Sequence, residues 1–531
     1  MKIAYAQMKI AAGHPDVNLK KILRLIDQAR AARADMIIFP QMTLSGQMLG
    51  ENVWAQESFM NDLESCGEEI IAASKNIYVV FNDWSEESYV IAKDGAVVET
   101  YDLPISINFI SDDEFLIGDA QLGVRFLSEP FNLDKEIFGE EVNYPVIYVG
   151  AVGIQNTGKT IYTFDGGSAV FNSRGEVVQH AEPFAECLNF VELEEVDDMP
   201  ALELPEVDEA EKIYRAIHYG VETFLEQIGM SKVVIGVSGG IDSAVAAALY
   251  VQVVGAENVY LVNMPSVFNS ATTKNLSEQL AKNLGCKYFV VPIQESVDWT
   301  VKQFEERGIT VSNFVKENIQ ARDRSARILA TMAAAVGGVF TCNANKAETT
   351  VGYATLYGDE AGFLSALADL WKFQVYDLAR YMNAEIYKRE VIPQGIIDIV
   401  PSAELSTAQN VDEGKGDPLR YSYHDYLLRA FAEDDLTPED ILRWYVSGQV
   451  EDNIGCAAGL VEKYFPTTKD FIADLERWWK QFTGMGVAKR IQSPPILAVT
   501  YCPYGARQES QNGPHFTKKY LAIKNKLLGD K

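Results

Sequence analysis

The residues best suited to chemistry lie in one short turn, SGGIDS, which begins at Ser238. Gly239 and Gly240 have no side chain, so their N–H groups can come close to phosphate oxygens. Ser238 and Ser243 add hydroxyl donors. Asp242 repels a phosphate unless a cation such as Mg²⁺ lies between them. The turn therefore predicts a phosphate site that also holds magnesium.

A strand and a helix must hold this turn in place. The run VVIGV before it is apolar and β-branched, as in a buried strand, and the alanine-rich run AVAAALY after it favours a helix. A helix N-terminus carries about half a positive charge, which attracts an anion. The turn is neither a Walker A loop nor a GxGxxG loop. The alternative without function is a tight turn in which a serine caps the helix.

The rest of the chain divides into stretches with different patterns. Up to about residue 193, short strand-like runs alternate with turns and two helical stretches, which is typical of a layered α/β sandwich. Further on, strands alternate with helices and predict a parallel sheet, and the last part is mainly helical. We therefore predict a first domain over 1–200, an acidic linker over 201–212 and a second domain over 213–531.

Composition argues against several classes of partner. The chain has 75 acidic and 46 basic residues, a formal net charge of −29, and a nucleic-acid backbone needs a basic surface. No apolar run reaches the about 18 residues of a membrane helix, so we expect no membrane partner. The six cysteines form no CxxC pair, and the N-terminus has no secretory pattern. We expect a cytoplasmic protein with reduced thiols.

The turn SGGxDS resembles the pyrophosphate-binding loop of N-type ATP pyrophosphatases, which cleave ATP between its α- and β-phosphates. Six further stretches resemble, in the same order, the motifs of NAD+ synthetases over roughly residues 211–500. They are NMPSVFNS, KENIQARDR, NANKAETTVGYATLYGDEAG, LADLWKFQVYDLARYMN, PSAEL and AKRIQSPP. The form TLYGD is similar to that of the long type, which also carries an amidase domain.

This resemblance implies a fold and a reaction. The fold is α/β: a nitrilase-like sandwich, then a parallel-sheet adenine nucleotide alpha hydrolase (ATP pyrophosphatase) domain with a helical C-terminal part. The enzyme is an amide-forming ligase of NAD biosynthesis, with ATP as co-substrate and Mg²⁺ as cofactor. The carboxylate of deamido-NAD+ attacks the α-phosphate of ATP, pyrophosphate leaves, and ammonia converts the acyl-adenylate into NAD+ and AMP. The resemblance also implies a homo-oligomer, at least a dimer through the synthetase domain.

The resemblance assigns roles to individual residues. Asp242 and Lys372 match catalytic positions, and Asp242 and Glu348 match magnesium ligands. The positions that bind ATP and pyrophosphate are matched by Ser238, Gly239, Gly240, Asp242, Ser243, Met264, Asn343, Ser402, Lys489 and Arg490. The positions that bind deamido-NAD+ are matched by Asn318, Arg322, Glu348, Asp369 and Lys372.

Some of these assignments have a plain alternative. The arginines Arg322, Arg324 and Arg327 also fit a solvated helix face. Lys489 and Arg490 fit an ordinary surface pair. Glu348 fits an ion pair with Lys346 on a surface turn.

The first third of the chain is similar to the nitrilase-type amidase domain of long NAD+ synthetases, in KIAYAQM, in the passage ending ADMIIFP and in TFDGGSAVFNSRGEVV. That domain releases ammonia from glutamine with a glutamate base, a lysine and a cysteine nucleophile. Here Gln41 replaces the glutamate, no lysine occurs between Lys93 and Lys135, and no cysteine occurs between Cys66 and Cys187. We therefore predict a pseudo-amidase and a synthetase that uses free ammonia.

Two other functions stay open. An amidase site rearranged around Cys66 or Cys187 would still supply ammonia from glutamine. A non-catalytic nucleotide-binding regulator would keep the turn and lose turnover. Asn343 and Ala344, which replace the threonine-glycine usual in the family, would permit that loss. A tRNA-modifying enzyme is disfavoured by the acidic charge and the absence of paired cysteines.

Overall fold

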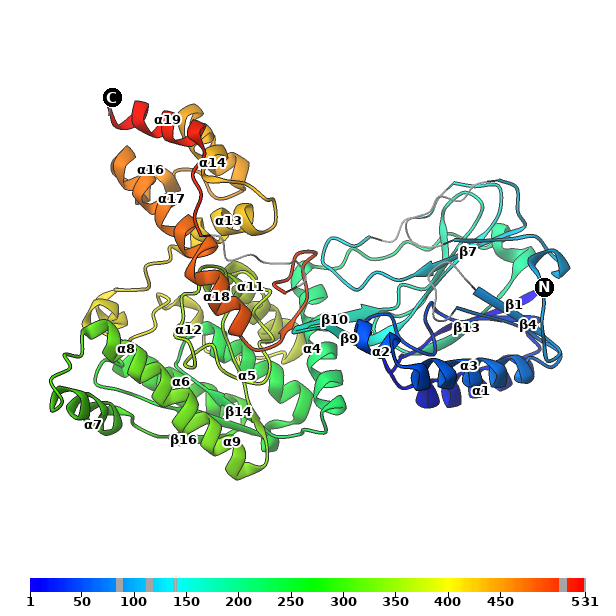
Figure 1. The fold of residues 1–531 in the computed structure, drawn as a ribbon, viewed down its shortest axis with the longest axis horizontal. Coiled ribbons are helices and arrows are strands. Elements are labelled where there is room, and N and C mark those ends of the chain that lie inside the picture. Colours follow the sequence, from blue (N-terminus) through cyan, green and yellow to red (C-terminus); the bar gives the residue numbers. More distant parts are fainter. Residues whose placement is uncertain (83–88, 111–117, 137–138, 140, 506–512, 530–531) are drawn as a thin grey trace. The chain divides into compact units, whose positions relative to one another are not determined.

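The computed structural model describes residues 1–531 except 83–88, 111–117, 137–138, 140, 506–512 and 530–531 (Figure 1). The chain separates into two compact units, Met1–Thr223 and Phe224–Lys531. The contact boundary falls inside helix α4 (Glu209–Gln227), and the residues 201–208 before that helix form no regular element. The predicted limits of the linker stay a prediction.

In its described residues the first unit contains two facing sheets. The first sheet has the order β13-β1-β2-β3-β4-β5, with bounds Cys187–Glu192, Lys2–Gln7, Met36–Ile38, Tyr78–Asn82, Tyr89–Lys93 and Ala96–Val97. The second has the order β12-β11-β8-β7-β6, with bounds Val177–His180, Ala169–Phe171, Val146–Gly150, Leu122–Leu127 and Ile107–Ile110. Strands β1, β2 and β3 are parallel, as are β6, β7 and β8. A hairpin of β9 (Val152–Thr157) and β10 (Thr160–Asp165) follows β8.

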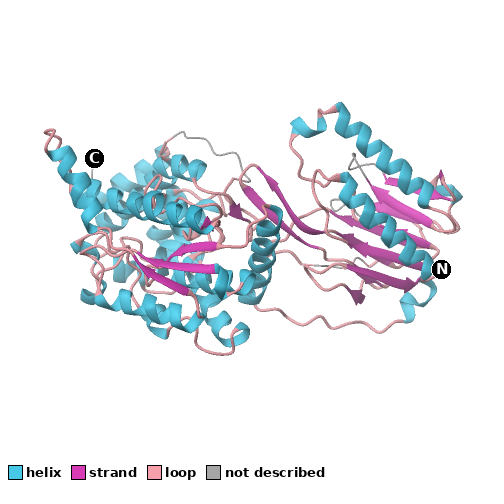
Figure 2. Ribbon diagram, turned by 90° about the horizontal axis from the view of Figure 1, so that it is seen from below, coloured by secondary structure: helices cyan, strands magenta, loops and turns pink. Residues whose placement is uncertain are grey.

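Strand β1 shows how the layers of this unit arise. Ile3 and Tyr5 lie in a core shared with the second sheet, whereas Ala4 and Ala6 pack toward helices α1 (Pro15–Ala31) and α3 (Glu57–Ala73). Successive side chains of a strand point to opposite faces, so a strand buried on both faces is apolar throughout. Figure 2 shows these helices along the strands. The predicted α/β sandwich is confirmed.

The second sheet is covered differently. Strands β7 and β8 are parallel neighbours, and such a pair needs a crossover that is usually helical. In its described residues the connecting segment 128–145 forms no helix. Coil lies on the outer face instead: the backbone of Gly139 lies against the ring of Phe171, and Tyr144 is buried there. In the described residues, coil therefore covers this side of the sandwich, whereas helices α1 and α3 cover the other side.

The second unit is built on a parallel sheet with the order β16-β15-β14-β17, with bounds Lys287–Val290, Val259–Asn263, Val233–Gly236 and Val339–Phe340. Val234 and Val262 face a core made with the helical segments over 294–336, while helix α5 (Ile241–Val254) contacts β14 and β15. Small alanine side chains let the stretch of α5 over residues 243–250 be buried throughout. The remaining helices here are α6 (Ala271–Leu284), α7 (Gln294–Glu305), α8 (Asn313–Arg322), α9 (Ala330–Val336), α10 (Lys346–Val351), α11 (Lys372–Tyr381) and α12 (Gln394–Asp398). The predicted parallel sheet is confirmed.

The C-terminal part is mainly helical, as predicted. Its helices are α13 (Tyr421–Ala432), α14 (Pro438–Ser447), α15 (Val450–Ile454), α16 (Leu460–Tyr464), α17 (Thr468–Thr483), α18 (Met485–Gln492) and α19 (Lys518–Leu528). They share an aromatic-rich core around Tyr423, Phe471 and Trp478. Across the part of the chain that is described, every helix is too short or too polar to cross a bilayer.

Candidate active site

The turn SGGIDS connects β14 to α5, and its shape depends on glycine. Gly239 has a φ of +89°, and a Cβ atom there would collide with the carbonyl of Thr273. Ser243 Oγ donates to the Gly240 carbonyl at 3.0 Å and accepts from Ser238 N at 3.3 Å. The N-cap of α5 is Gly240, which has no side chain to cap with. The alternative of a capping serine is therefore wrong.

Two cavities meet at this turn. The first has a volume of about 510 Å³ and the second about 240 Å³. Ser238, Asp242 and Glu348 border both, so these side chains lie at the junction of the two spaces. Two adjoining cavities with shared polar groups are suited to two ligands that react with each other.

A lysine joins the two carboxylates at the junction. Lys372 begins helix α11, and its Nζ forms an ion pair with Asp242 Oδ2 at 2.5 Å and lies 3.8 Å from Glu348 Oε1. The ammonium also lies 4.8 Å from the centre of the Tyr421 ring. Asp242, which lies more than 100 positions before Glu348 and Lys372 in the sequence, thus joins them in one charged group.

Asn345 is a site residue that sequence reasoning missed. It is fully buried and caps helix α10, where its Oδ1 accepts from Glu348 N at 3.1 Å. Its Nδ2 donates to Asp242 Oδ1 at 3.2 Å. The pattern of Asn345 three residues before Glu348 is a capping box, a signal that was available in the sequence. The cap couples the start of α10 to the turn SGGIDS.

Negative charge is in excess around Lys372. Burial raises the pKa of Glu348 to about 8. The ammonium of Lys372 opposes this rise, and the carboxylates of Asp242 and Asp417 add to it. Burial also raises the pKa of Asp417, and that of Asp425 to about 7. The junction is therefore short of positive charge when only protein groups are present.

This charge imbalance fits a magnesium ion. Asp242 and Glu348 are hard oxygen donors on the cavity wall, as Mg²⁺ prefers. Over the described ranges no cluster of three or more Asp, Glu, His or Cys side chains forms a metal cage. Mg²⁺ is commonly held by one or two carboxylates together with substrate phosphates, so a pair is sufficient.

Most of the predicted site residues border a cavity. Those on the first cavity are Ser238, Gly239, Gly240, Asp242, Asn318, Glu348, Lys372, Ser402 and Lys489. Those on the second are Ser238, Asp242, Ser243, Met264, Asn343 and Glu348. The binding roles assigned to them stay predictions, but the structure brings the side chains together.

Arg322 and Arg490 are placed outside both cavities, contrary to expectation. Arg322 is exposed and donates from Nε to the Leu356 carbonyl at 3.1 Å. Arg490 is 1% exposed and donates to the carbonyls of Thr350 and Phe482. A guanidinium buried in this way has no room for a phosphate, so Arg490 is not the predicted clamp, and it is not half of a surface pair either.

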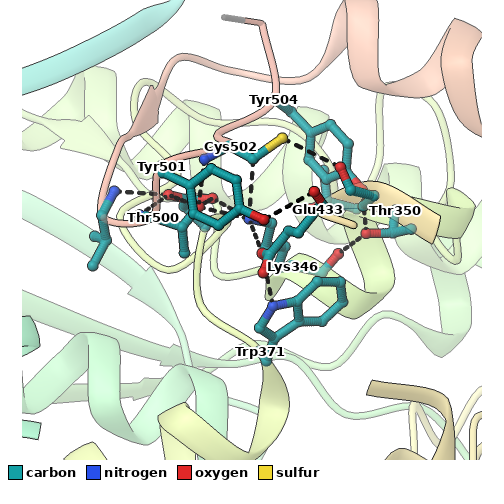
Figure 3. Close-up of polar contacts among 12 residues, drawn as sticks. Lys346, Thr350, Trp371, Glu433, Thr500, Tyr501, Cys502 and Tyr504 are labelled. Atoms are coloured by element: carbon teal, nitrogen blue, oxygen red, sulfur yellow. Dashed lines mark hydrogen bonds and ion pairs between the residues drawn. The ribbon is translucent and has the colours of Figure 1, made fainter. Parts of the chain in front are cut away.

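Asp369 also lies outside the cavities and is paired with Lys346. Figure 3 shows the buried contacts of Lys346 with Glu433 and Thr500. Lys346 Nζ lies 2.7 Å from Asp369 and 2.6 Å from Glu433, and donates to Thr500 Oγ1 at 2.8 Å. Asp369 Oδ2 accepts from the backbone N–H groups of Val499 and Thr500, each at 2.7 Å. Asp369 therefore anchors the C-terminal segment instead of a ligand. The surface pair of Lys346 with Glu348 is wrong, because Lys346 is fully buried.

Arg324 borders the second cavity, although its neighbours Arg322 and Arg327 are exposed. It donates from Nε to the Met264 carbonyl at 3.0 Å and from an Nη atom to Asn269 Oδ1 at 3.2 Å. Burial lowers its pKa to about 10. It lies on a π-helical segment, Asp323–Leu329, whose wider turn changes which side chains point inward. A solvated face is correct for Arg322 and Arg327 and wrong for Arg324.

In the first unit, the amide of Gln41 follows β2 and is buried. Its Oε1 has no hydrogen-bond partner among the described residues. The next residue, Met42, has a φ of +49°, and its N–H donates to Asn82 Oδ1 at 3.3 Å. A strained turn therefore persists at a position with no acid or base.

The cysteines of the first unit do not have the features of an activated nucleophile. Cys66 is buried on helix α3. Cys187 begins β13, accepts from Asn189 Nδ2 at 3.4 Å, and has a pKa raised by burial. A raised thiol pKa disfavours the reactive thiolate. These features favour structural roles.

The chain is similar in sequence to known proteins. Residues 213–456 match the family model described as NAD synthase. The chain is 28% identical over 529 residues to the glutamine-dependent NAD(+) synthetase of Aquifex aeolicus, covering 83% of this chain and 91% of that protein. It is 34% identical over 339 residues to the glutamine-dependent NAD(+) synthetase of Synechocystis sp. This match covers 61% of this chain and 58% of that protein.

Solved structures share the fold over nearly the whole chain. A glutamine-dependent NAD+ synthetase from Acinetobacter baumannii in complex with ADP aligns with a TM-score of 0.64 and 22% identity, covering 96% of this chain and 98% of that one. The enzyme from Cytophaga hutchinsonii aligns with a TM-score of 0.75 and 14% identity, covering 99% of each. The chain is therefore similar to glutamine-dependent NAD+ synthetases over most of its length, and residues 213–456 match the NAD synthase family model.

Proposed function

We propose that this chain is an amide-forming ligase that makes NAD+ from deamido-NAD+, ATP and free ammonia through an acyl-adenylate. The observation that carries the proposal is the junction of the two cavities. There Asp242, Lys372 and Glu348 meet between two spaces that would hold the two nucleotides.

The second cavity suits ATP. Met264 supplies an apolar wall, Asn343 and Ser243 supply polar groups, and the cavity opens onto the phosphate turn. The N–H group of Gly239 and the start of α5 favour the β- and γ-phosphates there, and Ser238 Oγ, which accepts from Gly240 N at 3.2 Å, borders the same cavity. Bound Mg²⁺, held by Asp242 and Glu348, would neutralise phosphate charge.

The first cavity suits the dinucleotide. Asn318 and Ser402 lie in its wall, and its volume of about 510 Å³ is in the range of ligand sites. When the nicotinate carboxylate attacks the α-phosphate, the bond to the β-phosphate breaks and negative charge moves onto pyrophosphate. The Lys372 ammonium and the donors of the turn are already in place to stabilise that charge. Ammonia then attacks the carbonyl carbon, and AMP leaves.

Free ammonia as the nitrogen source is supported by the first unit. Gln41 is neutral and accepts no proton at the position of the amidase base. The raised pKa of Cys187 leaves it a poor nucleophile. The named relatives are glutamine-dependent, so this point distinguishes the chain from them.

We further propose a homo-oligomer, at least a dimer, assembled through the second unit in the cytoplasm. Large apolar side chains exposed near α7 and α8 support it: Trp299 is 61% exposed and Phe314 is 73% exposed. Such a surface is costly to leave in water.

The test is product formation with each nitrogen donor. Purified protein is given ATP, Mg²⁺ and deamido-NAD+ with either ammonium or glutamine, and NAD+, AMP, pyrophosphate and glutamate are measured. We expect NAD+ with ammonium and no glutamate release from glutamine. Efficient glutamine use would mean a rearranged amidase site. If neither donor gives NAD+ or pyrophosphate, the result would favour the alternative of a non-catalytic nucleotide-binding regulator.

A further inference from the structure

The C-terminal helices supply part of the wall of the first cavity. Arg477, Trp478 and Gln481 from α17 and Met485 from α18 border it, together with the turn and Lys372. Of these four, only Arg477 carries a charge. Its side chain is exposed, and the guanidinium carbon lies 4.6 Å from the centre of the Trp478 ring.

Trp478 is a fixed platform for this arginine. It is 2% exposed, and its indole Nε1 donates to Asp474 Oδ1 at 3.2 Å. The other oxygen of Asp474 lies 2.9 Å from His424 Nε2. His424 Nδ1 accepts from Arg420 N at 2.8 Å, so the proton of the neutral ring is on Nε2 and is donated to Asp474. The carboxylate is thus used by Trp478 and His424 and not by Arg477.

The other cations of this cavity already have partners. Lys372 is paired with Asp242, and Lys489 donates to the carbonyls of Gly352 at 2.6 Å and Ala354 at 2.5 Å. Arg477 forms no hydrogen bond or ion pair with any described residue. Five N–H donors therefore remain for a ligand.

The acidic side chains of the wall make this arginine important. Five carboxylates border the cavity: Asp242, Glu317, Glu348, Asp359 and Asp417. A dinucleotide whose phosphates enter such a space needs a local cation, because like charges repel. A guanidinium stacked on an aromatic ring presents its N–H edge in a fixed direction, and that edge matches two phosphate oxygens.

We propose that Arg477 binds a phosphate group of the dinucleotide substrate and so contributes to the binding of deamido-NAD+ in the first cavity. The inference rests on the proposed function, and it assigns a substrate contact to the C-terminal helices. Arg477 borders only the larger cavity, so its effect is on the dinucleotide and not on ATP.

The test compares Arg477→Gln with Lys480→Gln. Lys480 is on the same helix, one turn further on, is exposed and pairs with Glu476 at 3.3 Å. Because a hydrogen bond between charged groups is lost, we expect Arg477→Gln to raise the KM for deamido-NAD+ by about 10-fold or more. The KM for ATP and kcat should stay within about twofold, and Lys480→Gln should match the wild type. Arg477→Lys should recover part of the loss.

The outcomes separate this inference from the proposed function. An unchanged KM for deamido-NAD+ in Arg477→Gln overturns the inference and leaves the synthetase intact. A rise in the KM for ATP alone also overturns it. If the wild type makes no NAD+, the proposed function fails, and calorimetric titration with deamido-NAD+ decides the inference. Tighter binding by the wild type than by Arg477→Gln supports it, and equal or absent binding overturns it.

Discussion

The two units each place a polar residue just after a parallel strand, and they differ in what surrounds it. In the second unit, Asp242 follows β14 and is held by Lys372 and Asn345. In the first unit, Gln41 follows β2, and its Oε1 has no described partner. Both turns keep unusual backbone angles, a φ of +89° at Gly239 and +49° at Met42. The backbone of such a turn can thus persist when the charged side chains of a site are absent. The charged site of the second unit depends in addition on partners from distant segments of the chain.

The largest effect is expected from removing the cation of the buried network that holds the C-terminal segment. In Lys346→Met, Asp369 and Glu433 lose their shared partner in a buried position. Breaking a buried ion pair costs about 3–5 kcal/mol, so we expect a clear fall in thermal stability and loss of NAD+ formation. Calorimetry and the ammonium assay measure both. Lys388→Met, at an exposed ion pair with Glu385, is the control and should change neither.

Asp242→Asn tests whether charge, and not shape, sets the second unit apart. The amide fills the same space but does not hold magnesium or pair with Lys372. We expect turnover to fall about 100-fold or more, because stabilisation of the leaving pyrophosphate is lost. Steady-state kinetics with ammonium measures this, alongside a melting curve. Turnover within a few-fold of the wild type would show that the carboxylate is not part of the reaction.

Asp425→Asn tests the crowding of carboxylates in the second unit through the pH dependence of folding stability. Burial raises the pKa of Asp425 to about 7, so the folded protein holds a proton that the unfolded chain has released. Stability from this group is present at low pH and is lost as pH rises from about 4 to about 7. The amide still accepts from Phe373 N, which lies 3.0 Å from Asp425 Oδ2.

We therefore expect the melting temperature of Asp425→Asn, relative to the wild type, to rise between pH 5 and pH 8. The free energy behind this shift is about 1–3 kcal/mol, since one pKa unit corresponds to about 1.4 kcal/mol. Thermal unfolding at the two pH values measures it. An identical pH dependence in both proteins would contradict the raised pKa.

The smallest effect is expected in the first unit. Gln41→Met replaces a buried amide with an apolar side chain of similar volume, and the amide oxygen has no described partner to lose. We expect ammonium-dependent turnover within about twofold of the wild type. A large loss of turnover would mean that the first unit takes part in the reaction, and the contrast between the two units would fail.

The sequence by itself determined the elements and the turn. Alternation of apolar side chains predicted the sandwich and the parallel sheet, because the patterns of strands and helices are local. The glycines of SGGIDS predicted the phosphate turn for the same reason. Motif resemblance selected Asp242, Glu348 and Lys372, which the structure brings to one junction.

Only the tertiary structure decided which charged side chains face a cavity. Arg324 turns inward on a π-helical segment, while Arg490 is buried against carbonyl groups and Asp369 pairs with Lys346. Arg477 forms no hydrogen bond or ion pair with the described residues, and the carboxylate of Asp474 contacts Trp478 and His424 instead. These outcomes depend on contacts between residues far apart in the chain, and local sequence patterns do not specify such contacts.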